Sequence, residues 1–157
     1  MHATTRFAIL VCLLALTACN RSGAPRSSAH EVTGSSAERV AAVSAIIAKH
    51  KAPPTAMLDA QFIQEQIGDG TLGPSDFRAF YFIEVTPQDV AKWNQLLTPL
   101  GATAEYAAPA QPREWWIARG DFAALQFYKP VTLTGRAQGW LGVSPQTGRI
   151  YIFTFTM

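Results

Sequence analysis

The chain has 157 residues, of which 48% are hydrophobic and 15% are charged, and its formal net charge is +2 at pH 7. This length accommodates one domain and a targeting segment, and so apolar a composition excludes an intrinsically disordered chain. Because the charge is close to neutral and no block of like charge occurs, the sequence lacks the basic patch of a nucleic-acid-binding protein.

Residues 1–18 have the pattern of an export signal. Arg6 gives a weakly basic start, and an unbroken apolar run extends from Phe7 to Leu16. Ten residues rise only about 15 Å as a helix, roughly half the hydrocarbon core of a bilayer. The run therefore predicts the core of a signal peptide and not a stable membrane span.

The apolar run ends in Leu16-Thr17-Ala18-Cys19. This tetrad resembles the lipobox of bacterial lipoproteins, in which the cysteine thiol receives a diacylglyceryl group and signal peptidase II cuts just before it. The resemblance implies that Cys19 is the lipidation site and begins the mature protein. An ordinary signal peptide with a chance cysteine is the alternative.

The remaining cysteine agrees with this interpretation. Cys12 lies inside the signal, so the mature chain keeps one cysteine and no internal disulfide is expected despite export. Asn20 follows Cys19, where the lipoprotein class uses aspartate for retention at the inner membrane. The resemblance thus implies the periplasmic face of the outer membrane as the address.

Residues 19–35 are predicted to be the lipidated cysteine and a flexible tether, because Gly, Ser, Ala and Pro dominate there and no periodicity occurs. A single domain is predicted over 36–157. Ser35 and Glu38 fit a capping box, and Val43 and Ile47 share one face of the helix that follows. A chain beginning at Ser35 is therefore expected to be as stable as one beginning at Asn20.

Further elements follow in chain order. A second helix is predicted over 55–67, with Leu58 and Phe62 packing inward and Ile63 as a further candidate. A turn rich in Gly and Pro is predicted over 68–76. The aromatic and β-branched run 77–85 predicts a strand. Thr86 and Pro87 predict the start of a helix whose buried face carries Val90, Trp93 and Leu97.

The remainder predicts mostly β-structure. Short strands are expected near 103–106 and 115–117 and over 122–128, and a hairpin pairs 139–144 with 149–156 across the turn 145–148. The predicted fold class is α+β, an antiparallel sheet of about five strands with about three helices packed on it. Both faces of the strand at 77–85 carry apolar residues, so either helices cover both faces, which we favour, or one face meets a partner.

Most catalytic patterns are absent from the sequence. The predicted domain contains one histidine, His50, and has no nucleophile motif, paired zinc histidines or phosphate-binding loop, so no cofactor and no metal are expected. Paired carboxylates could in principle cleave a glycoside, but no spacing singles out a pair. The carboxylates available for such a pair are Asp76, Glu84, Asp89, Glu105, Glu114 and Asp121.

Aromatic residues are concentrated late in the chain, and adjacent tryptophans in a strand would point to opposite faces. One of Trp115 and Trp116 is therefore expected to leave the core and to contact a partner. The sequence predicts a lipid-anchored, non-catalytic envelope module that binds a protein or glycan, either an inhibitor or immunity-type protein or an accessory of an envelope complex. A carboxylate-dependent envelope hydrolase is the alternative. The predicted binding residues are Trp115, Trp116, Tyr128, Arg136 and Trp140.

Overall fold

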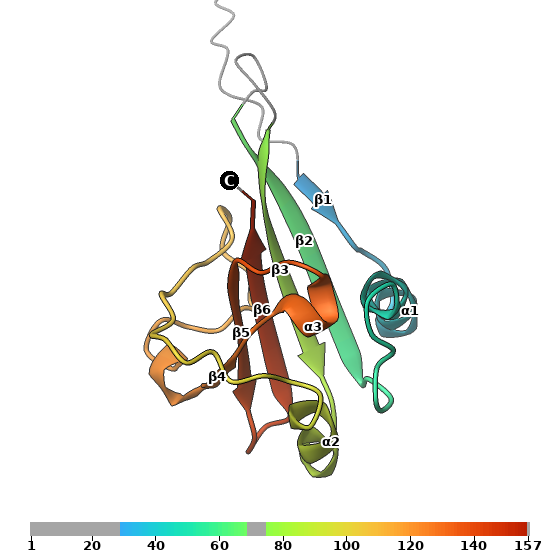
Figure 1. Ribbon diagram of the computed structural model, residues 1–157. Coiled ribbons are helices and arrows are strands. Elements are labelled where there is room, and N and C mark those ends of the chain that lie inside the picture. Colours follow the sequence, from blue (N-terminus) through green and yellow to red (C-terminus); the bar gives the residue numbers. More distant parts are fainter. Residues whose placement is uncertain (1–28, 69–74, 157) are drawn as a thin grey trace, which may run out of the picture.

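The computed structural model describes residues 29–68 and 75–156, and these form one antiparallel sheet with helices against it (Figure 1). Within the described residues the sheet has six strands in the order β1-β2-β3-β6-β5-β4, which confirms the predicted α+β class. The strands are β1 (Ala29–Glu31), β2 (Asp59–Ile67), β3 (Asp76–Glu84), β4 (Gln126–Tyr128), β5 (Gly139–Ser144) and β6 (Arg149–Phe155).

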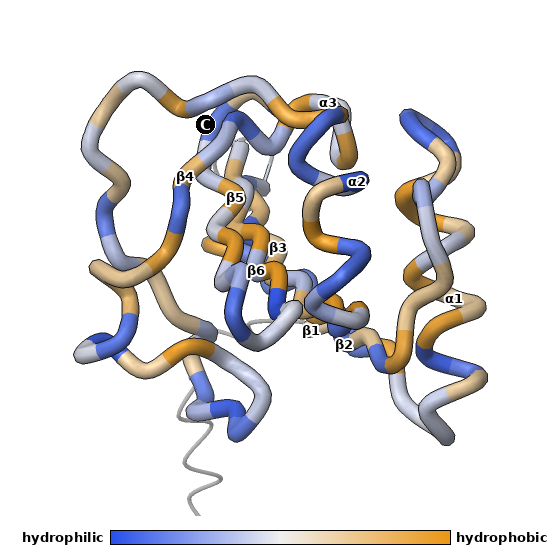
Figure 2. Tube along the Cα trace, turned by 90° about the horizontal axis from the view of Figure 1, so that it is seen from below, coloured by the Kyte–Doolittle hydropathy of each residue, from blue (hydrophilic) through white to orange (hydrophobic). Residues whose placement is uncertain are grey.

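All three α-helices of the described residues pack on one face of this sheet, here called the helix face (Figure 2). Buried residues of each helix join one cluster with alternate residues of the central strands. Val43, Trp93 and Leu133 are fully buried there, one from each helix. The helices are α1 (Ser36–Ala48), α2 (Val90–Asn94) and α3 (Val131–Thr134), and the 3-10 turns are η1 (Pro87–Asp89) and η2 (Phe122–Ala124).

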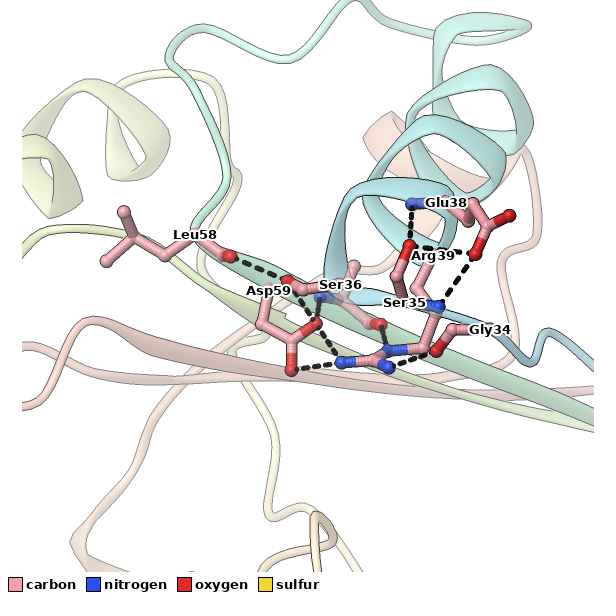
Figure 3. Close-up of polar contacts among 8 residues, drawn as sticks. Gly34, Ser35, Ser36, Glu38, Arg39, Leu58 and Asp59 are labelled. Carbon is pink, nitrogen blue, oxygen red and sulfur yellow. Dashed lines mark hydrogen bonds and ion pairs between the residues drawn. The ribbon is translucent and has the colours of Figure 1, made fainter.

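The first helix begins with the predicted capping box. The Ser35 hydroxyl accepts from the Glu38 amide, and the Glu38 carboxylate accepts from the Ser35 amide at 2.8 Å. One turn later Arg39 bonds both carboxylate oxygens of Asp59, at 2.7 and 2.9 Å, and Ser36 donates to the same carboxylate (Figure 3). These contacts fix the start of β2 against α1.

The prediction of a helix over 55–67 is wrong, because residues 59–67 form β2. Phe62 faces the helix side and Ile63 the opposite side, so both are buried although they are neighbours. In the sequence, the two adjacent apolar residues also fit the buried face of a helix. Pairing with β3 over the full length of the strand overrides local propensity, and Leu58, expected inside, is 56% exposed.

Part of the segment predicted as a tether is ordered on the sheet. Ala29–Glu31 form β1, which pairs with β2 so that Ala29 lies opposite Glu65. Val32 packs against the helix-face cluster, and its amide donates to the Phe62 carbonyl at 3.0 Å. The folded domain therefore begins by residue 29, several positions before the predicted boundary at 35.

The helix predicted after Thr86 exists in two short pieces, η1 and α2. Its predicted buried residues Val90, Trp93 and Leu97 are buried, as expected. The Thr86 hydroxyl donates to the Asp89 carboxylate at 2.9 Å and does not bond a backbone amide.

Several of the later β predictions also differ from the structure. The hairpin of β5 and β6 is confirmed. The strands predicted near 103–106 and 115–117 are absent from the described residues, and 122–124 form η2 instead of the first half of a strand.

Helices do not cover both sheet faces, contrary to our preferred expectation. The second face is covered by the irregular residues 100–125, here called the cover segment, which joins α2 to β4 (Figure 2). Phe80, Trp140 and Tyr151 of the sheet are buried with Trp116 and Phe122 of the cover segment. Chain without regular strands or long helices therefore closes this half of the core.

Candidate functional site

The candidate site lies on the covered face, at the end of the sheet nearest α2. The register places Asp59 opposite Glu84, and Glu84 opposite Arg149, in one row across three strands. The next row inward contains Phe82 opposite Tyr151. Because side chains alternate along a strand, both rows point to the same face, so a polar row borders an aromatic one.

The cover segment is held to the sheet by side-chain hydrogen bonds to its backbone. Glu65 of β2 is only 5% exposed, and its carboxylate accepts from the Ala110 amide at 2.8 Å. Trp140 of β5 donates its indole N–H to the Glu105 carbonyl at 2.8 Å. Irregular chain over an apolar face leaves backbone polar groups to be satisfied, and these side chains satisfy two of them.

Bonds within the cover segment and to the edge strand complete its attachment. The Trp116 indole donates to the Ala107 carbonyl at 2.8 Å, and the Tyr106 hydroxyl donates to the Ile117 carbonyl at 3.0 Å. Arg113 pairs with Glu31 of β1 at 2.9 Å. The segment is thereby tied to both β1 and β5, at the two sides of the sheet.

Where the cover segment stops short of the polar row, a concave site of about 730 Å³ remains, here called the cleft. Its floor is the two cross-strand rows, and its walls come from two stretches of the cover segment and from the turn between β5 and β6. The lining residues are Asp59, Phe82, Glu84, Glu114, Trp115, Trp116, Ile117, Ala118, Asp121, Ala124, Leu125, Ser144, Thr147, Arg149 and Tyr151.

Two of the four lining carboxylates already have cationic partners. Partial burial alone would raise the pKa of Asp59, but hydrogen bonds from Arg39, the Ala60 amide and Ser36 outweigh burial and hold that pKa below its ordinary value. Glu84 lies 3.7 Å from Arg149. Glu114 and Asp121 are exposed on the cover segment, so they add negative charge to the rim of the cleft.

The aromatic part of the cleft combines buried and accessible rings. Burial raises the pKa of the Tyr151 hydroxyl, an effect that Arg149 opposes, so this group is a neutral hydrogen-bonding partner at pH 7. Trp116 is 8% exposed, whereas its neighbour Trp115 is only partly buried. Their rings are perpendicular, at 89°, with centroids 5.8 Å apart. Trp115 therefore offers a ring surface that a ligand can contact.

The predicted binding residues separate into two groups. Trp115, Trp116 and Trp140 lie together on the covered face, with the Trp116 and Trp140 ring centroids 5.7 Å apart. Tyr128 packs against the cluster on the helix face. Burial raises the pKa of Tyr81, another residue of the helix-face cluster, and the positive charge of Arg136 opposes that rise. The structure therefore does not bring all five residues together in one place.

Cys19, the predicted lipidation site, lies outside the described residues. Within the described ranges no helix is long and apolar enough to cross a bilayer. Nor do the described residues hold a group of three or more His, Cys, Asp or Glu side chains arranged to bind a metal ion.

Much of the cleft could not be identified from the sequence. The sequence predicts a helix at Asp59, and it gives no reason to select Arg149 as a site residue. The sequence does contain one usable signal. Phe82 and Glu84 are two residues apart, as are Arg149 and Tyr151, and residues spaced by two lie on the same face of a strand. Glu84, Glu114 and Asp121 were among six candidate carboxylates, and only the fold shows that these three line one cleft.

Comparison with known proteins gave no match: no protein-family model, curated protein or solved structure matches this chain.

Proposed function

We propose that the protein is a lipid-anchored, non-catalytic module of the bacterial envelope that binds a protein or glycan partner in the cleft. The observation that carries this proposal is the partly buried Trp115 in the wall of a concave site of about 730 Å³. The volume of this site falls within the range of ligand pockets, and its mixed polar and aromatic lining suits a partly polar partner.

The proposed anchor rests on the sequence alone. The tetrad Leu16-Thr17-Ala18-Cys19 resembles a complete lipobox. Residue 20 is asparagine, whereas aspartate at this position is the usual signal for retention at the inner membrane. The proposed address is therefore the periplasmic face of the outer membrane.

The chemistry of the cleft supports binding to a partly polar surface. Trp115 provides a face on which a sugar ring or an aliphatic side chain can stack. Next to it, Glu84 and Arg149 offer an acceptor and a donor, and the Ser144 and Thr147 hydroxyls offer both. Because the sheet and the bonded cover segment support these groups, little ordering is needed on binding.

A carboxylate-dependent hydrolase is the second candidate, since four carboxylates line the cleft. Such an enzyme needs a general acid that stays protonated near neutral pH, usually through burial in an apolar site. Asp59 has the opposite environment, because Arg39 and its other hydrogen bonds favour the ionised form. Glu84 is paired with Arg149, and Glu114 and Asp121 are exposed. These environments favour binding over hydrolysis.

Site-specific crosslinking in the native envelope tests the proposed function. A benzophenone side chain replaces Glu114 at the rim of the cleft, and in a matched control it replaces Gln88, an exposed residue of η1 next to α2. We expect an adduct from position 114 and none from position 88. Protease digestion removes the added mass if the partner is a protein, and glycosidase digestion removes it if the partner is a glycan.

Trp115→Ala supplies the second arm of this experiment. In the chain with the crosslinker at position 114, this change should abolish the adduct while the domain stays folded. Equal adducts from positions 114 and 88 would contradict a binding site in the cleft. Turnover of envelope glycan that Glu114→Gln or Asp121→Asn abolishes would instead support the hydrolase.

A further inference from the structure

We propose that the domain stands on the membrane with one defined end of its sheet against the lipid surface, so that the cleft opens away from the membrane. The lipid-facing end, here called the anchor end, is formed by the start of β1 at Ala29, the end of β2 at Ile67 and the end of β6 at Phe155. This orientation rests on the anchor at Cys19 in the proposed function.

The strand register fixes the two ends of the sheet. Ala29 lies opposite Glu65, close to the end of β2, and Arg78 at the start of β3 lies opposite Phe155. The chain therefore enters the fold at the end of the sheet where β2 and β6 finish, at the top of Figure 1. The opposite end carries Asp59 and Arg149, which line the cleft.

Chain length limits how the domain can turn relative to the lipid. Only residues 20–28 lie between Cys19 and β1, and nine residues reach about 30 Å at full extension. Glu65 and Asp59 are six residues apart on β2, which is about 20 Å along a strand. Bringing the cleft to the lipid would require the connecting segment to run back along β2, which would use about two thirds of its full reach.

Surface chemistry favours the same orientation. Exposed apolar side chains do not distinguish the two ends, because Ile67 at the anchor end is 42% exposed and Leu58, next to Asp59 at the cleft end, is 56% exposed. Charge does distinguish them. The cleft end carries Asp59, Glu84, Glu114 and Asp121, and carboxylates lose hydration when they approach lipid.

Depth-dependent quenching of a fluorescent label tests this orientation. The full chain is lipidated in cells, purified and reconstituted into phosphatidylethanolamine and phosphatidylglycerol vesicles that contain a nitroxide-headgroup lipid. One variant, Ile67→Cys, places the label at the anchor end. The matched variant, Gln146→Cys, places it in the exposed turn between β5 and β6 at the cleft end. We expect the label at position 67 to be quenched at least twofold more than the label at position 146.

The outcomes separate the orientation from the anchor. If Cys19→Ser releases the protein from the vesicles, while the anchored chain shows equal quenching at both positions or stronger quenching at 146, the orientation is overturned and the anchor stands. If the native chain does not float with the vesicles, the anchor in the proposed function fails, and the orientation fails with it. Intact circular dichroism of both variants confirms that the labels report on the folded domain.

Discussion

The carboxylate of Glu65 accepts a hydrogen bond from the backbone amide of Ala110 at 2.8 Å, although the two residues are 45 positions apart in the chain. The same carboxylate pairs with Arg78 on the neighbouring strand at 3.3 Å. One buried side chain therefore connects β2, β3 and the cover segment, whose far end forms the wall of the cleft.

Replacing Glu65 with Ala should loosen the cover segment. The change leaves the Ala110 amide without its acceptor and Arg78 without its partner, and we expect a loss of about 2–3 kcal/mol in the free energy of unfolding. Denaturant titration of the chain beginning at Ala29 measures this loss. Glu65→Gln keeps an acceptor for Ala110 and should lose less, and the exposed Glu114→Ala should lose almost nothing. Equal losses in all three variants would show that Glu65 does not hold the segment.

Removal of β1 should destabilise the domain, which reverses the expectation from the sequence. A chain beginning at Ser35 lacks the backbone pairing with β2, the packing of Val32 and the ion pair between Glu31 and Arg113. We expect its free energy of unfolding to fall by about 1–3 kcal/mol relative to the chain beginning at Ala29. Matching thermal midpoints for the two chains would indicate that β1 contributes nothing to stability.

The two adjacent tryptophans should respond differently to truncation. Trp116 is buried among Phe80, Trp140 and Tyr151 and donates to the Ala107 carbonyl, so Trp116→Ala should cost about 3–5 kcal/mol of stability. Trp115→Ala should cost clearly less, because its ring is only partly buried. If the cleft binds the partner, Trp115→Ala should weaken that binding by about 2 kcal/mol, roughly thirtyfold. Unfolding of both variants would place Trp115 in the core as well.

The ion pair between Asp59 and Arg39 should make stability depend on acid pH. The pKa of Asp59 is lowered in the folded protein, so the folded state favours the carboxylate more than the unfolded state does. This contribution is fully present above the ordinary carboxyl pKa of about 4 and is lost as pH falls through the folded value below it. Wild type should therefore be more stable than Asp59→Asn at pH 7, and the gap should close by about pH 2. A gap that is constant with pH would show that ionisation of Asp59 is not its cause.

Gly148 should not tolerate a side chain. Its φ is +69°, and an added Cβ would collide with the Val85 carbonyl oxygen. Gly148→Ala should therefore destabilise the domain by at least about 1–2 kcal/mol through strain and displacement of this turn. Gly120→Ala is the matched control, because nothing lies within 4 Å of a Cβ there, and its stability should stay close to that of wild type. A fully stable Gly148→Ala would show that the turn can adjust.

The sequence predicts correctly those strands whose residue pattern lies within one short segment of the chain. The strand at 76–84 and the hairpin of β5 and β6 have runs of β-branched and aromatic residues bounded by turn residues. The sequence does not reveal β2, because this strand is buried on both faces and lacks the simple alternation of a strand with one exposed face. Its interspersed Gln and Glu residues also matched the composition of a helix.

The cover segment and the cleft depend on contacts between distant parts of the chain. Nothing near Glu65 in the sequence indicates that it bonds Ala110, and nothing near Asp59 indicates that it shares a cleft with Trp115. Trp115 and Trp116 differ in burial, as expected, but alternation of side chains along a strand is not the cause. These residues lie in a turn and not in a strand, and the bonds of the cover segment, not strand alternation, set their burial.

The central pairing of the sheet joins β3 to β6, with Glu84 opposite Arg149 and Arg78 opposite Phe155. The middle of the fold therefore cannot close until β6 has left the ribosome. Pairings that span so much of the sequence form slowly, because the intervening chain must first be brought together. Until β6 emerges, β3 of a nascent chain can be paired on one side only, so the native centre of the sheet is still missing.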